Sequence, residues 1–383
     1  IGLYDHYQYI NIGGTYPFGN SNNPLKVPNA SLGAMPAVDR TWETIETYNA
    51  GIDFATLNNR LSGTFDYFIK DNKNMFYAEE FPTILGTSAP SINGAHVRTN
   101  GWELTLNWKD KIGKVGYRIG LNLSDNKTKV ISLSDSRNPG HGLMGFVEGY
   151  PTNSFFIYEF DGFIKDEADL ADYKTKMKGG VPTNLRVGDA KYVDKDGDGV
   201  LEPTLYKEGD PNSGDIVYKG TNNQRYLYGI NLGLDWKGID ISAFLQGVGK
   251  WDCINGTYAG GGEVWKQSSQ YFYHNTWSPD RPNAEYPRLT QDGGIHGYNY
   301  QWSDAPYKFF NNRYLRLKEV QIGYTFPTTL TKKIGVEKLR VYATGMNLLE
   351  WDNLPNGFDP EAPYTENLIP FSRTYSIGVN VQF

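Results

Sequence analysis

The chain has 383 residues, a mean hydropathy of −0.54 and a formal charge of −6. No run approaches the roughly 18 apolar residues of a membrane helix, which excludes a helical membrane protein. The acidic balance and the lack of a basic stripe argue against nucleic acid as a partner. A membrane β-strand needs only about 10 residues of alternation, so these values still allow a membrane barrel.

The predicted elements are strands, because apolar and polar residues alternate with a period of two in nine segments. The last segment is typical: Tyr375, Ile377, Val379 and Val381 share one parity, and the chain ends on Phe383. In chain order, the strands are predicted within 46–57, 60–70, 101–108, 115–124, 228–236, 239–247, 319–326, 337–345 and 373–383. Residues 1–12 are predicted as a candidate tenth strand.

The connections between these segments alternate in length. The shorter ones are 57–60, 110–114, 237–238 and 327–337, and the long ones are 71–100, 126–225, 249–311 and 348–372. An outer-membrane barrel places short turns at its periplasmic rim and long loops outside the cell. The pattern therefore favours an all-β, antiparallel transmembrane β-barrel with long extracellular loops.

The two faces of the predicted strands agree with a barrel. Aromatic residues such as Trp102, Trp108 and Trp236 lie near strand ends on the apolar face, as an aromatic girdle would. Asn231 and Asp235 lie on the opposite face, which suits a wet lumen. The alternative is a soluble sandwich of half-buried strands with aromatic residues at their ends.

Several long stretches are familiar. They include "RTWETIETYNAGIDFATLNNRLSGTFDYFIKDNKNMF", "NGWELTLNW", "VGDAKYVDKDGDGV", "WSPDRPNAEYPRL" and "YLRLKEVQIGYTFP". In order along nearly the whole chain, they resemble the C-terminal part of a SusC/RagA-type TonB-dependent transporter from a Bacteroidetes-like outer membrane. The resemblance implies a plugged barrel of about 22 strands, of which residues 1–383 supply nine or ten. Phe383 resembles the terminal aromatic by which such proteins are recognised for insertion.

The resemblance also implies a function and partners. We expect TonB-dependent import of a large nutrient, a glycan or an oligopeptide, across a Gram-negative outer membrane. The expected partners are a SusD-like surface lipoprotein, outer-membrane lipid and the remainder of the chain's own barrel and plug. A TonB-type inner-membrane complex would act through an N-terminal part that we expect to be absent from this sequence, as we do the plug and the first strands.

Two other functions remain open at this stage. One is a self-contained ten-strand outer-membrane enzyme of the lipase or protease type, with Ser, His and Asp brought together from separate strand ends. However, all five histidines fall in predicted loops, and no G-x-S-x-G stretch is present. The other is a soluble carbohydrate-binding module. We expect no enzymatic activity.

The motif "DKDGDGVLE" matches the first half of a calcium loop. Alternate carboxylates of Asp194, Asp196 and Asp198 can converge on a hard cation, while glycine permits the bend. The twelfth position is Leu205 in place of the usual Glu, so Glu202, another nearby acid or water would complete the site. We predict a structural Ca²⁺ here; the alternative is a solvated acidic turn. No other cofactor is expected.

The long connection 249–311 is dense in aromatic residues. Flat rings can stack on sugar faces or peptide side chains, so part of this set is predicted to bind substrate. The alternative is that these rings pack the loop against itself or against a partner subunit. The candidate residues are Trp265, Tyr271, Tyr273, Tyr300 and Trp302.

Overall fold

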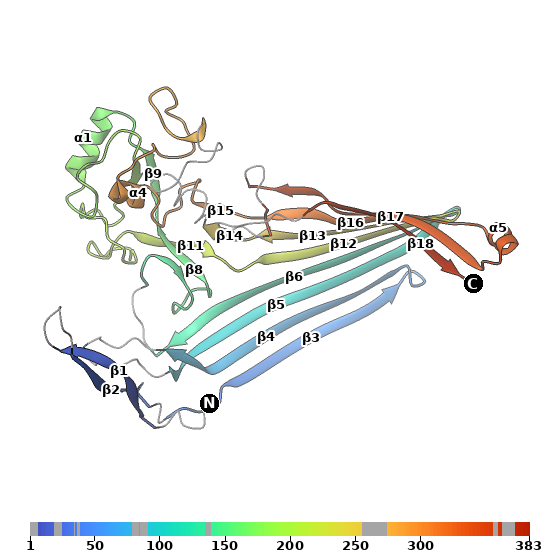
Figure 1. Cartoon of the computed structure of the whole chain (residues 1–383), viewed down its shortest axis with the longest axis horizontal. Helices are drawn as coiled ribbons and strands as arrows, with labels where there is room; N and C mark the ends of the chain where they lie inside the picture. Colours follow the sequence, from blue (N-terminus) through green and yellow to red (C-terminus); the bar gives the residue numbers. More distant parts are fainter. Residues whose placement is uncertain are drawn as a thin grey trace.

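A computed structural model describes residues 7–18, 25–33, 35–36, 39–78, 84, 91–134, 139–254, 274–354, 359–361 and 372–383. Its largest element is an antiparallel sheet of nine strands in the order β18-β17-β16-β13-β12-β6-β5-β4-β3 (Figure 1). All nine predicted strands are confirmed. They are β3 (Thr44–Thr56), β4 (Leu61–Ala78), β5 (Ser91–Ile112), β6 (Val115–Leu133), β12 (Arg225–Trp236), β13 (Ile239–Lys250), β16 (Tyr314–Thr325), β17 (Lys338–Asp352) and β18 (Thr374–Gln382).

The short turns follow from residues that tolerate a left-handed backbone. Between β12 and β13, Lys237 and Gly238 have φ of 48° and 87°, as a two-residue type I′ hairpin turn requires. Between β3 and β4, Asn58 and Asn59 have φ of 56° and 61°, and asparagine tolerates this region better than most residues. At the opposite ends, several strands extend beyond their predicted bounds, so the long connections are shorter than the sequence suggested.

Strand register aligns the apolar residues on one face of the sheet. Phe65 of β4 lies opposite Leu104 of β5, and Leu104 lies opposite Leu123 of β6. The same face continues across the other strands with Ile230, Ile241, Ile322, Val341 and Val379. The described residues leave this face uncovered, as the exposures of Ile322 (53%) and Ile377 (84%) illustrate. A wide uncovered apolar face backed by a polar one is typical of a membrane-barrel wall.

The candidate tenth strand in residues 1–12 is a wrong prediction for the part that the structure describes. β1 (Ile10–Phe18) pairs with β2 (Leu25–Leu32) in a separate two-stranded sheet. Because β2 follows closely in sequence, closing this hairpin requires less loop entropy than pairing with a distant strand.

The largest packed core lies in the long connections, and not in the single-layered sheet. We call residues 139–222 and 274–308 the loop module; it lies at the end of the sheet where β6 stops and β12 starts (Figure 1). Its main core contains Phe156, Ile164, Leu185, Tyr192 and Ile216, all under 3% exposed.

In the described ranges no helix is long and apolar enough to cross a membrane. The remaining elements are β7 (Gly142–Met144), β8 (Ser154–Tyr158), β9 (Phe160–Phe163), α1 (Glu167–Lys176), β10 (Ala190–Tyr192), β11 (Ile216–Thr221), β14 (Asp252–Ile254), α4 (Gly293–Asn299), β15 (Phe309–Asn311), α5 (Thr328–Thr331) and η2 (Lys332–Ile334).

Candidate functional site

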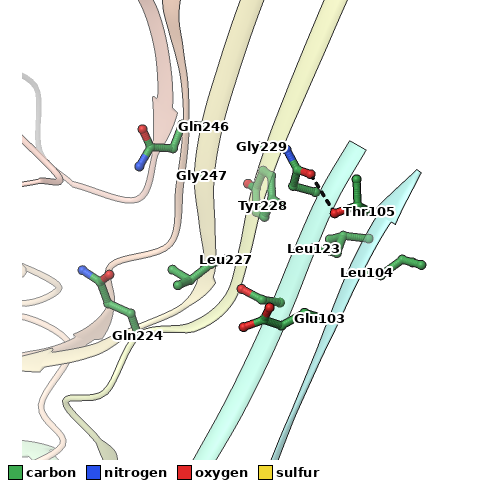
Figure 2. A pocket seen from close by; sticks show the side chains of 12 residues that line it. Glu103, Leu104, Thr105, Leu123, Gln224, Leu227, Tyr228, Gly229, Gln246 and Gly247 are labelled. Carbon is green, nitrogen blue, oxygen red and sulfur yellow. Dashed lines mark hydrogen bonds between the residues drawn. The ribbon is translucent and has the colours of Figure 1, made fainter. Parts of the chain in front are cut away.

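The polar face of the sheet carries a row of hydrogen-bonding side chains near the loop module. Thr105 of β5 lies opposite Asn122 of β6, and its hydroxyl donates to Asn122 Oδ1 over 3.1 Å (Figure 2). Gly229 of β12 then separates Asn122 from Gln246 of β13. Since glycine adds no side chain, the row is open at its centre.

A hollow of about 460 Å³ occupies this part of the wall. Glu103, Ser124 and Gln224 contribute further polar groups to its lining, and Leu227 contributes an apolar one (Figure 2). A cavity of this size can hold part of a polar ligand. Amides, hydroxyls and one carboxylate can fix such a ligand by hydrogen bonds, but nothing in this set is arranged for covalent chemistry.

Above the sheet, the two longest connections interlock to form the loop module. Tyr158 N donates to Trp302 O over 2.9 Å, and Phe160 N donates to Asp304 Oδ1 over 2.6 Å. Further in, Ala190 N donates to Asn299 Oδ1 over 2.9 Å. Because these partners are more than 100 residues apart, the connection after β6 and the connection after β13 fold as one unit.

A small ion network reinforces this junction. Lys195 and Lys219 both donate to the carboxylate of Glu159, and Lys219 Nζ also lies 2.9 Å from Asp304 Oδ2. The hydrogen bonds from Lys195 and then Lys219 hold the pKa of Glu159 below its usual value. The charged form of Glu159 is therefore the one that the module stabilises.

Tyrosine hydroxyls complete the interior of the module. Tyr192 donates to Tyr298 O over 2.9 Å, and the hydroxyls of Tyr173 and Tyr298 lie 2.8 Å apart. Burial, together with the neighbouring Tyr173, raises the pKa of Tyr298 well above its ordinary value. These phenols are neutral hydrogen-bonding groups that hold α1, β10 and α4 together.

The predicted calcium loop is compact in the structure. One carboxylate oxygen from each of Asp194, Asp196 and Asp198 lies within 4.8 Å of the others. Ca²⁺–oxygen distances of about 2.3–2.6 Å would let one ion touch all three, so the donor set fits this cation. Glu202, also predicted as a ligand, is exposed and is not one of these three acids; its N–H donates to Asp215 Oδ2 over 2.7 Å.

Backbone amides fix the shape of this acidic loop. Gly197 N and Gly199 N each donate to Asp194 over 2.8 Å, and Gly214 N donates to Asp196 over 3.0 Å. Buried Asp215 lies nearby, where burial and then the charges of Asp196 and Asp194 raise its pKa. A cation among these carboxylates would offset that repulsion, and the calcium assignment stays a prediction.

The predicted substrate-binding aromatics fall into two groups. Trp265, Tyr271 and Tyr273 lie outside the described residues. Tyr300 is 8% exposed, with its ring 5.6 Å from that of Tyr307. Trp302 is half-buried and packs against a core cluster that includes Phe155, Ile157 and Ile254. Tyr300 and Trp302 thus help to join the two connections, and their contact with substrate stays a prediction.

Sequence reasoning missed a buried ion cluster at the same end of the sheet. Arg316 of β16 is 1% exposed and contacts Glu350, Asp359 and Glu361, each over 2.7 Å. Lys318 lies 2.8 Å from Glu361. The available signal was weak, because Arg316 and Lys318 precede the strand predicted at 319–326; continuing its alternation backward would have placed these cations near the long-loop end.

The chain is similar in sequence to known TonB-dependent receptors. No model of a protein family matches the chain. The chain is 27% identical over 370 residues to TonB-dependent receptor P3 of Formosa agariphila, an alignment that covers 89% of the chain and 34% of that receptor. It is 24% identical over 395 residues to TonB-dependent receptor SusC of Bacteroides thetaiotaomicron, which covers 96% of the chain and 34% of SusC.

Comparison of the fold with solved structures agrees with the sequence similarity to TonB-dependent receptors. A solved structure of the RagAB peptide transporter is similar to the chain with a TM-score of 0.72 and 22% sequence identity. The match covers 100% of this chain and 39% of the RagAB chain. The chain thus spans about a third of the length of the curated relatives that it matches. The resemblance to SusC/RagA-type TonB-dependent receptors is confirmed, and the fold is that of part of a RagA-type barrel wall.

Proposed function

We propose that the chain forms part of the wall of an outer-membrane importer that takes up a large nutrient with TonB-type energy coupling. The observation that carries this proposal is the nine-stranded sheet, with an uncovered apolar face on one side and a polar, hollowed face on the other. The apolar face would contact lipid and the polar face would line the passage. The relatives' names, which are those of receptors and transporters, support transport over an enzymatic role.

A surface lipoprotein of the SusD type is the proposed partner at the loop end. The loop module is a folded, preorganised platform, because its core and its ion network join two separate connections. Solved RagAB structures are described in "open-open" and "closed-closed" states, which supports a lid-like partner for the similar wall of this chain. Such a lid would enclose ligand between itself, the module and the polar hollow.

The proposed substrate is an oligosaccharide, with an oligopeptide as the second class. The hollow offers mainly neutral donors and acceptors, among them Thr105, Asn122 and Gln246, which suit a ligand rich in hydroxyl groups. An oligopeptide is the second class because RagAB is a peptide transporter.

The decisive experiment is purification, in detergent, of the protein that carries this sequence from outer membranes. We expect a denatured mass far above 43.2 kDa, a co-purifying lipoprotein, and calorimetric binding of oligosaccharides in preference to peptides. Preferential peptide binding would replace the substrate class and leave the transport proposal standing. A mass near 43.2 kDa without a lipoprotein, and with no ligand bound, would contradict the importer itself.

A further inference from the structure

A second hollow, of about 280 Å³, lies on the opposite, apolar face at the loop ends of β12, β13, β16 and β17. Tyr228 lies opposite Gly247, which in turn lies opposite Leu315, and Leu315 lies opposite Trp351. Gly247 has no side chain, which leaves room for the ring of Tyr228. The Tyr228 ring leans over Gly247, and its hydroxyl donates to Tyr314 O over 2.9 Å. The hollow is lined by the apolar side chains of Tyr228, Leu315 and Trp351 together with the polar groups of Arg313, Asp352 and Asn353.

Arg313 closes this hollow on the side of the loops. It directly precedes β16 and has the same parity as Leu315, so it extends the apolar row with a cation. Its side chain is exposed, and none of the hydrogen bonds or ion pairs of the described residues uses its guanidinium. Asp352 also lines the hollow; its carboxylate accepts from Leu354 N over 2.7 Å and forms no ion pair with Arg313. Within the part of the chain that the structure describes, the guanidinium is therefore left to pair with an added anion.

We propose that this hollow binds the phosphorylated headgroup of an outer-leaflet glycolipid. The phosphate would lie at Arg313, whose planar fork suits two phosphate oxygens, and the acyl chains would run along Leu315 and Trp351. The apolar row continues directly from the cation, so the occupant needs both an anionic head and apolar tails. Tyr228 and Trp351 are aromatics of the kind found at the membrane–water interface. This inference rests on the membrane position proposed above.

Native mass spectrometry of the delipidated, intact outer-membrane protein tests the inference. With diphosphorylated lipid A as the probe, Arg313→Gln should lower the lipid-bound fraction about fivefold or more, because a charge-assisted bidentate contact is lost. Arg313→Lys should restore part of that binding. Dephosphorylated lipid A should bind the parent protein and Arg313→Gln equally. As a charge control, Lys127→Gln removes an exposed cation of β6 that does not line the hollow, and should leave binding unchanged.

Three outcomes would overturn the inference. Equal binding of lipid A to the parent and to Arg313→Gln would remove the site. An equal loss in Lys127→Gln would reduce it to general charge attraction. Competition by inorganic phosphate at the same concentration as the lipid would indicate a free-anion site, in which case Trp351→Ala would not weaken binding. Nutrient import, measured in parallel, distinguishes this failure from failure of the proposed function, since Arg313 lies on the face opposite the passage.

Discussion

Arg316 Nη2 donates to Asp359 Oδ1 over 2.7 Å, and this contact attaches the connection between β17 and β18 to the barrel wall. The two side chains are 1% and 4% exposed, so both charges are out of water. A buried pair of this kind is held by mutual attraction and by further hydrogen bonds, here from Arg316 to Glu350 and Glu361. The cluster therefore fixes where residues 359–361 lie relative to β16 and β17.

Replacing Arg316 by Met should detach this connection. It removes the Arg316 guanidinium from the buried carboxylate of Asp359, and removing one member of a buried pair destabilises by about 3–5 kcal/mol. Hydrogen exchange should rise at 359–361 and at the start of β18. Arg118→Met is the matched control, because Arg118 and Asp235 are 58% and 56% exposed and such surface pairs contribute about 1 kcal/mol or less. Equal protection in the parent and in Arg316→Met would contradict the role of the cluster.

The acidic loop gives a calcium prediction. Adding Ca²⁺ should slow proteolysis in the connection between β6 and β12, and a chelator should reverse the effect, because a bound cation stabilises the folded form by mass action. Asp196→Asn should weaken calorimetric Ca²⁺ binding about tenfold or more. Asp172→Asn is the control, since that exposed carboxylate pairs with Lys176 on α1. Proteolysis that is insensitive to Ca²⁺ and chelator would remove the assignment.

Lys308 is a buried amine, 8% exposed, and burial lowers its pKa from 10.5 to about 8. Between pH 8 and 10.5 the unfolded chain binds a proton that the folded chain does not, so the stability of the loop module should rise with pH there. Below pH 8 both states are protonated and the full penalty of burying the charge remains, roughly 3 kcal/mol.

Lys308→Met should therefore stabilise the loop module by about 2–3 kcal/mol at pH 7 and abolish its rise in stability between pH 8 and 10.5. Hydrogen exchange of the module as a function of pH measures both effects. Destabilisation by Lys308→Met at pH 7 would show that the amine has a favourable role in the fold.

Gln246 is exposed on the polar face and lines the larger hollow. Gln246→Ala should lower ligand affinity about 2- to 10-fold, the loss expected for one neutral hydrogen bond, without changing barrel stability. Gln382→Ala, an exposed amide in the last residue of β18, should leave affinity unchanged. If both variants bind ligand like the parent, the hollow is not the binding site.

Local sequence patterns were enough to predict the nine-stranded wall. Alternation with a period of two is a local property, so it identified the nine strands, the face of each residue and the turn at Asn58 and Asn59 before any contact was known. The sequence also indicated the resemblance to SusC/RagA-type TonB-dependent receptors, because collinear motifs occur in the strands and in the acidic loop. It failed for the candidate tenth strand, because residues 10–12 pair with β2 in a local hairpin that competes with the wall for the same backbone groups.

The fold of the long connections depends on contacts between residues far apart in the sequence. Asn299 Nδ2 donates to Asp189 Oδ1 over 2.9 Å, yet the two residues are 110 positions apart. Neither lies in a periodic segment that predicts the other. The same holds for Arg316 with Asp359, and for Tyr300, whose aromatic character suggested a ligand surface before its burial was known. Local patterns report which face a residue takes, whereas contacts between loops depend on the path of the whole chain in space.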